Sequence, residues 1–161
     1  MFTIAHISDL HFGRAHPLAA GALETSLAAA GADLVIISGD ITQAGRRSEY
    51  AQAGRFLSRL SQPYLAVPGN HDAPVYHPAE RLAFPWRRFE RHVGATEPRV
   101  VRPAPGLAVI GVNTARRAAP RLNWAFGRIS DRSIDAADAM ARERRAAGDF
   151  VMLACHHPFV V

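Results

Sequence analysis

Apolar residues along the chain alternate between short continuous runs and longer stretches with helical spacing. The run over residues 33–38 holds almost no interior polar residue, which is typical of a strand buried on both faces. Similar short runs are bounded by glycine, proline and polar residues, as strands in globular domains usually are. The pattern therefore predicts β-strands at residues 2–7, 33–38, 64–67, 99–102, 107–112 and 150–155.

Between these runs the spacing of apolar residues becomes helical. The stretch 18–30 is rich in Ala and Leu and is followed by Gly31, a typical residue after a helix end. Helical patterns also cover residues 48–60 and 78–93, the latter as one or two short helices, and residues 130–147. Strands that alternate with helices predict an α/β fold, and the length suits one domain over residues 1–161.

Polar side chains gather just past the ends of four predicted strands. Asp9 and His11 follow the first strand, Asp40 follows the second, Asn70 follows the third, and His156 follows the last. In open α/β sheets, ligands bind beyond the carboxyl ends of the strands. We therefore expect these side chains to converge on one crevice.

The types of these residues indicate a metal site. Asp9 and His11 are two residues apart, so in an extended segment both side chains would point the same way and could bind one cation. Asp40 adds a carboxylate whose two oxygens could bridge two cations. Mixed oxygen and nitrogen ligands suit Mn, Fe or Zn. Gly39 and Gly69 fit tight turns or a close approach of the backbone to the site.

Taken together, Asp9-x-His11, Gly39-Asp40 and Gly69-Asn70-His71-Asp72, with His156 far downstream, resemble the calcineurin-like metallophosphoesterase superfamily. The resemblance covers essentially the whole chain. It implies a sandwich of two sheets flanked by helices. It also implies two metal ions, the first bound by Asp9 and His11, both bridged by Asp40, and the second bound by Asn70 and His156.

By the same resemblance, a hydroxide that bridges the two metals attacks phosphorus in line with the leaving group. His71 would approach the phosphate and stabilise or protonate that leaving group. The family pattern places His156 on the metal and leaves His157 with a structural or supporting role. The superfamily also closes its site with a downstream Gly-His-x-His motif, which these residues lack, so we expect a fragment that is incomplete at its C-terminus.

The residue sequences of these motifs resemble most the cyclic nucleotide phosphodiesterase-like (class III) members of the superfamily. It favours a phosphodiesterase that acts on a small phosphodiester or a nucleotide. Two alternatives stay open at this stage. One is a phosphomonoesterase or nucleotide pyrophosphatase, and the other is a catalytically incomplete fragment that binds phosphate or a partner without turnover.

Composition changes this picture only slightly. The net charge is +5, and all 19 basic residues are Arg, scattered in short clusters without interleaved aromatic residues, which argues against a nucleic-acid partner. The single cysteine, Cys155, excludes a disulfide within the chain and favours a reducing compartment. No signal peptide or membrane-spanning stretch is visible, so a cytoplasmic protein without a membrane partner is expected. The sequence leaves the oligomeric state open.

Overall fold

The first part of the chain forms a parallel three-stranded sheet. The computed structural model describes residues 2–118 and 126–158. Helices α1 (Pro17–Ala29) and α2 (Arg47–Leu57) connect the strands, which lie in the order β1-β2-β3. As predicted, α1 is followed by Gly31, which has a φ of 58°. The strands are β1 (Ile4–Ile7), β2 (Leu34–Ser38) and β3 (Tyr64–Val67).

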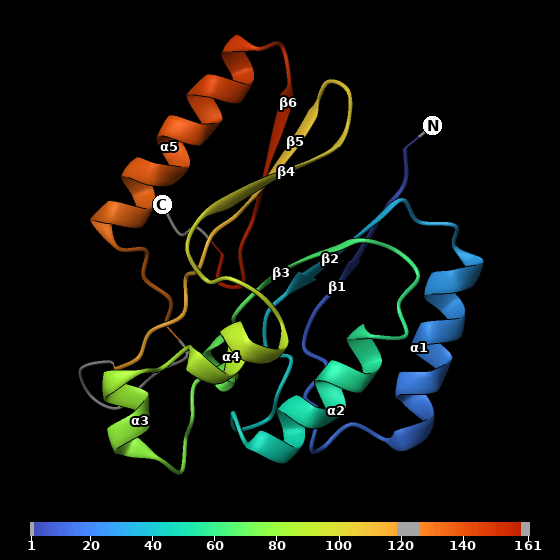
Figure 1. Cartoon of the computed structure of the whole chain (residues 1–161), viewed down its shortest axis with the longest axis vertical. Coiled ribbons are helices and arrows are strands. Elements are labelled where there is room, and N and C mark those ends of the chain that lie inside the picture. The colour runs from blue at the N-terminus through green and yellow to red at the C-terminus, as the bar shows by residue number, and fades with distance from the viewer. Residues whose placement is uncertain (1, 119–125, 159–161) are drawn as a thin grey trace.

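A second three-stranded sheet follows, in the order β4-β5-β6 (Figure 1). Strands β4 (Arg99–Ala104) and β5 (Leu107–Gly111) form an antiparallel hairpin whose turn contains Gly106 at φ 77°. Helix α5 (Asp131–Ala146) then leads to β6 (Phe150–Ala154), which pairs with β5 in parallel. Three short helices lie between the two sheets in the sequence: η1 (Asn70–Asp72), α3 (Pro78–Ala83) and α4 (Arg87–His92).

The side chains of β2 show how the layers stack. Val35 and Ile37 pack in a cluster with Tyr50 of α2, whereas Leu34 and Ile36 pack on the opposite face with residues of the second sheet. Every residue of β2 is buried, as its continuous apolar run predicts. Fully burying a side chain of this size stabilises the fold by about 1.5–3 kcal/mol. The apolar character of both faces of β2 thus holds a helical layer on one side and a second sheet on the other.

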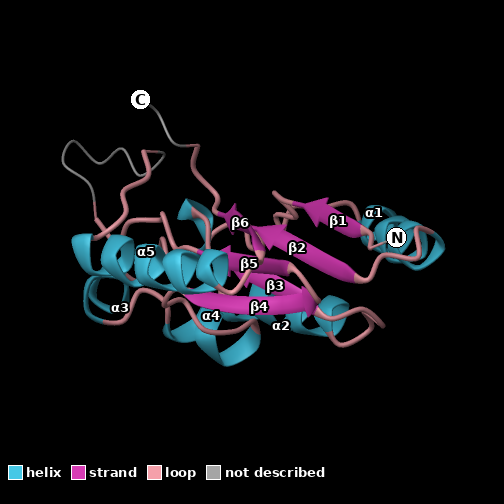
Figure 2. Cartoon of the chain, turned by 90° about the horizontal axis from the view of Figure 1, so that it is seen from above, coloured by secondary structure: helices cyan, strands magenta, loops and turns pink. Residues whose placement is uncertain are grey.

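Helix α5 completes the stack. Ala137 of α5 packs against Ile110 and Val112 on the outer face of the second sheet. Helices α1 and α5 therefore lie on opposite sides of the strands (Figure 2). The order is helices, sheet, sheet, helix, which is the two-sheet α/β sandwich flanked by helices that the resemblance implies. Within the described ranges, no helix combines the length and the apolar character that a membrane crossing requires.

Candidate metal centre

The segments that follow β1 and β2 run side by side and carry three of the predicted ligands. The amide of Asp9 donates to the carbonyl of Gly39 at 3.1 Å, and the amide of His11 donates to the carbonyl of Asp40 at 3.0 Å. Asp9, His11 and Asp40 have positive φ values of 56°, 45° and 51°. The expectation that Asp9 and His11 lie in an extended segment is therefore wrong. Positive φ costs a non-glycine residue about 1–3 kcal/mol, and such residues cluster at functional sites.

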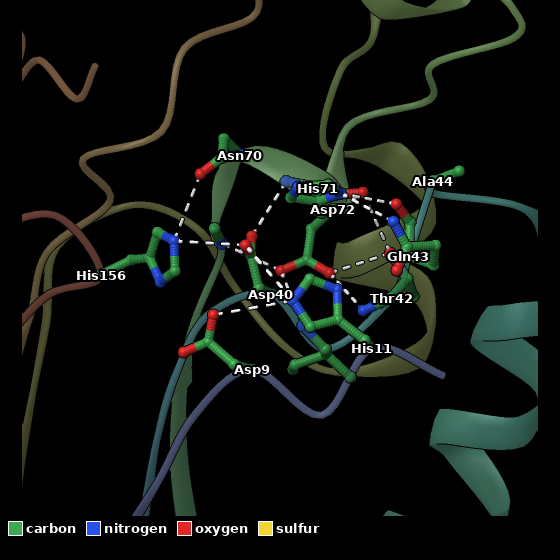
Figure 3. Close-up of polar contacts among 12 residues, drawn as sticks. Asp9, His11, Asp40, Thr42, Gln43, Ala44, Asn70, His71, Asp72 and His156 are labelled. Carbon is green, nitrogen blue, oxygen red and sulfur yellow. Dashed lines mark hydrogen bonds and ion pairs between the residues drawn. The ribbon is translucent and has the colours of Figure 1, made fainter. Parts of the chain in front are cut away.

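Despite that difference, the three side chains converge as predicted. One ligand atom from each of Asp9, His11 and Asp40 lies within 4.8 Å of the other two. His11 Nε2 is 3.7 Å from Asp9 Oδ1 and 4.0 Å from Asp40 Oδ2 (Figure 3). Two carboxylates and an imidazole at this spacing could hold one cation.

Asp40 also faces a second group of candidate ligands. His156 Nε2 lies 3.5 Å from Asp40 Oδ2 and 3.3 Å from Asn70 Oδ1. His156 Nδ1 donates to the carbonyl of Ser38 at 2.7 Å, which leaves Nε2 as the nitrogen directed at the site. A hydrogen bond from the far ring nitrogen to a carbonyl is the usual way a metal-binding histidine is oriented. Asp40 is thus shared by the two groups.

The electrostatics of this pair favour a positive charge beside Asp40. Burial raises the pKa of the Asp40 carboxyl, but the hydrogen bond and charge of His156 and the amide of His71 outweigh it, so its pKa lies below the usual value. Burial lowers the pKa of His156, but Asp40 raises it to about 9. In the protein alone, a proton on His156 supplies the charge that Asp40 favours. A bound metal ion would supply it instead and release that proton.

His71 lies in the same site but is held differently. Its backbone amide donates to Asp40 Oδ1 at 2.9 Å, and its Nδ1 donates to the carbonyl of Gln43 at 2.6 Å. The ring packs edge-on against His11 with 4.9 Å between centroids. Since Nδ1 is occupied by the carbonyl, Nε2 is the nitrogen left for chemistry.

Two glycines allow the site segments to approach each other. A Cβ on Gly39, whose φ is 89°, would lie 2.7 Å from the His156 ring and 2.8 Å from the amide nitrogen of Gly69. A Cβ on Gly69 would lie 2.1 Å from Asp40 Oδ1 and 2.4 Å from the Asp40 amide nitrogen. The prediction of close backbone approach at these glycines is confirmed.

Asp72 is fully buried and links the segments that follow β2 and β3, a role that the sequence did not predict. Its carboxyl accepts from the amides of Thr42 at 2.8 Å and Gly69 at 2.9 Å, and from the Thr42 hydroxyl at 2.9 Å. The Tyr50 hydroxyl donates to the carbonyl of Asp72 at 2.6 Å. Burial raises the pKa of Asp72 to about 6, against the effect of these amides. The only available signal was its place at the end of Gly69-Asn70-His71-Asp72.

His157, the neighbour of His156, is bound elsewhere. Its Nδ1 lies 2.9 Å from the Thr114 hydroxyl, which also accepts from the His157 amide at 3.0 Å. Burial lowers the pKa of His157. The two histidine rings touch edge-on at 4.7 Å, but only His156 faces Asp40 and Asn70 in the described part of the chain. The geometry therefore favours His156 as the ligand of the pair.

These features define a candidate binuclear metal site at the ends of strands in a two-sheet α/β sandwich. A family model described as calcineurin-like phosphoesterase matches residues 2–160. The chain belongs to the calcineurin-like phosphoesterase family, so the resemblance seen in the sequence is confirmed. The reaction class of this family is the hydrolysis of phosphate esters.

Two curated proteins are similar to part of the chain. A glycerophosphodiester phosphodiesterase, GpdQ, from Enterobacter lignolyticus (strain SCF1) is 36% identical over 80 residues, which cover 43% of this chain and 29% of the relative. A probable cyclic nucleotide phosphodiesterase, syc0937_d, from Synechococcus sp. is 35% identical over 82 residues, which cover 45% of this chain and 32% of the relative. The matched part spans about a third of each of these longer relatives.

Among solved structures, a dimetal phosphatase from Danio rerio is similar in fold, with a TM-score of 0.67 and 14% sequence identity. The similarity covers 98% of this chain and 70% of that protein. At this identity the similarity concerns the fold, and it confirms the two-sheet architecture.

Proposed function

We propose that this domain is a two-metal phosphodiesterase. The observation that carries the proposal is the position of Asp40 between two groups of ligands. Asp9, His11 and Asp40 would bind the first metal, and Asp40, Asn70 and His156 would bind the second. His71 would act on the substrate and bind neither ion.

The chemistry of the donor atoms supports this assignment. Carboxylate, amide oxygen and imidazole ligands together suit Mn, Fe or Zn. His156 presents Nε2 to the site because Nδ1 donates to the Ser38 carbonyl, as a metal-binding histidine requires. The three strained backbone positions at Asp9, His11 and Asp40 also favour a functional site over a surface cluster.

Two metal ions in such a site would supply an activated water and offset the charge that develops on the phosphate. The chain's own residues supply the rest. Because its Nδ1 donates to the Gln43 carbonyl, His71 could donate to the oxygen of the leaving group only from Nε2, and this step requires the imidazolium form, which returns to the neutral ring when Nε2 gives up its proton. The amide of His71 donates to Asp40, so the proton donor and the central ligand keep a fixed relative position.

The preference for diesters is supported by the names of the two curated relatives, which are a glycerophosphodiester phosphodiesterase and a probable cyclic nucleotide phosphodiesterase. A small phosphodiester or a nucleotide is therefore the proposed substrate class. Hydrolysis rates of bis(p-nitrophenyl) phosphate and p-nitrophenyl phosphate should be compared on one preparation. Faster turnover of the monoester would contradict the diesterase proposal and leave the phosphoesterase class intact.

The metal assignment is tested by counting ions. The 161-residue chain would be loaded with Mn²⁺, freed of excess metal and examined by elemental analysis. We expect two ions per chain, a loss of both in Asp40→Asn, and no loss in Asp33→Asn. Asp33 is a matched control because, among the residues that the structure describes, its carboxyl accepts one hydrogen bond, from the amide of Thr3 at 2.7 Å, and lies outside the candidate metal centre. Two ions retained in Asp40→Asn would overturn the bridging role.

A further inference from the structure

A cavity lined mainly by arginine lies beside α2 and α4. Its volume is about 260 Å³, and none of its lining residues belongs to the candidate metal centre. Four guanidinium groups and one imidazole surround a single carboxylate. The lining residues are Arg47, Glu80, Arg87, Arg88, Arg91 and His92.

The single carboxylate in this cavity is already neutralised. Arg88 Nε donates to Glu80 Oε1 at 2.8 Å, and a second nitrogen of the same guanidinium contacts the other carboxyl oxygen. Arg88 is buried, with 7% of its surface exposed, and it also donates to the carbonyl of Gly45 at 2.7 Å. This contact with Arg88 lowers the pKa of Glu80 and keeps it ionised at neutral pH. Arg88 and Glu80 therefore form a fixed ion pair without net charge in the lining of the cavity.

The other three arginines have no carboxylate partner in contact, although the charge of Arg47 also acts on Glu80 from a longer distance. In the described ranges 2–118 and 126–158, the side chains of Arg47, Arg87 and Arg91 form no ion pair and no hydrogen bond. Arg87 and Arg91 are four residues apart on α4, so their like charges share one face and repel by a few tenths of a kcal/mol. Arg47 lies in the first turn of α2, where the helix dipole disfavours a cation.

Three guanidinium groups that have no salt-bridge partner and line one small cavity suit a compact anion with several negative charges. We propose that this cavity binds a diphosphate group, either as the free anion or as part of a larger molecule. A guanidinium presents paired N–H donors that match phosphate oxygens two at a time. A diphosphate carries about three negative charges at neutral pH and therefore matches the three free guanidiniums. The site does not depend on the metal centre, so the two proposals stand or fall separately.

Isothermal titration of the metal-loaded 161-residue chain with methylenediphosphonate, which resists hydrolysis, tests the proposal. Two binding events are expected, one at the metals and one at the cavity. The double variant Arg47→Gln, Arg91→Gln should lose one event, or weaken it by about 100-fold, since each charge-assisted contact contributes about tenfold or more in affinity. Both arginines are exposed, so the variant is expected to fold.

Two further variants make the result specific. Asp40→Asn should lose the event at the metals and keep the event at the cavity. Arg132→Gln, Arg145→Gln removes the same charge from exposed positions on α5 and should bind as the wild type does. Unchanged binding in the Arg47, Arg91 variant, or an equal loss in the α5 control, would overturn the proposal.

A parallel titration with α,β-methylene-ADP identifies the source of the diphosphate. If α,β-methylene-ADP binds at the cavity more tightly than methylenediphosphonate does, and the Arg47, Arg91 variant loses this binding, the ligand is a nucleoside diphosphate or a similar molecule. Equal affinity would assign the free anion. Failure of both probes to bind outside the metal centre would refute the site.

Discussion

Replacing Gly69 with alanine tests whether the metal centre depends on close packing of its backbone segments. Gly69 has φ −104° and ψ −177°, extended values that any residue adopts, so alanine meets no conformational penalty there. The new Cβ would lie 2.1 Å from Asp40 Oδ1 and 2.4 Å from the Asp40 amide nitrogen, whereas real Cβ contacts stay beyond 3.0 Å. The segments must therefore separate by about 0.6–0.9 Å, and rotation of the Asp40 side chain cannot relieve the clash with its backbone.

Overpacking of this kind costs about 1–3 kcal/mol of unfolding free energy. A shift approaching 1 Å between Asp40 and Asn70 should also separate the two groups of ligands, and displacements of that size lower activity by about 100-fold. Urea unfolding and the count of Mn²⁺ ions per chain measure the two effects. We expect Gly69→Ala to be destabilised and to hold fewer ions than the wild type.

Gly21→Ala is the matched control for this substitution. Gly21 lies inside α1, and nothing lies within 4 Å of a Cβ built there. The same change should stabilise the protein by about 0.5–1 kcal/mol, because glycine is unfavourable within a helix. If Gly69→Ala unfolds within 0.5 kcal/mol of the wild type and keeps its metal, close packing is not what the site requires.

Three other predictions test separate parts of the structure. Glu80→Gln removes the partner of buried Arg88 and should lower the unfolding free energy by about 1 kcal/mol at pH 7. The folded pKa of Glu80 lies below its ordinary 4.5, so this contribution is complete above about pH 4.5 and is lost as the pH falls. The unfolding free energies of wild type and variant, measured in urea, should therefore converge near pH 3. A difference that stays constant with pH would contradict this. His156→Ala should lose bound Mn²⁺ whereas His157→Ala should keep it, and the reverse pattern would exchange their roles. Tyr50→Phe removes the buried hydroxyl that donates to the carbonyl of residue 72 and should cost about 1–2 kcal/mol by thermal unfolding, with no effect expected if that bond contributes nothing.

The sequence predicted the elements of the fold because their apolar patterns are strong. Every predicted strand and helix in the described ranges is present, and the boundaries differ by a few residues, as at β1, which begins at Ile4. Periodicity could not show how the strands divide into two sheets. That division depends on which buried face of β2 meets Val109 of β5, a long-range contact that leaves no local signal.

The candidate ligands could also be chosen from the sequence, since they follow strand ends and match a family pattern. The backbone conformation that brings these ligands together could not be predicted from the sequence. Asp9 and His11 meet Asp40 through positive φ values, and L-residues adopt these only when surrounding contacts enforce them. The Ser38 and Gln43 carbonyls that orient His156 and His71 belong to the main chain, which any residue type supplies.

The positive φ values at Asp9, His11 and Asp40 lower the stability of the fold while they bring the candidate ligands together. Each residue is held where glycine would be relaxed, at a cost of about 1 kcal/mol or more per position. Asp9→Gly and His11→Gly would each lose a ligand and yet relieve this strain, whereas Asp40→Gly would also lose the contacts of its carboxylate with the His71 amide and with His156. A laboratory selection for thermal resistance alone would therefore erode the metal centre first, whereas a selection that also required turnover would keep these three positions and gain stability elsewhere.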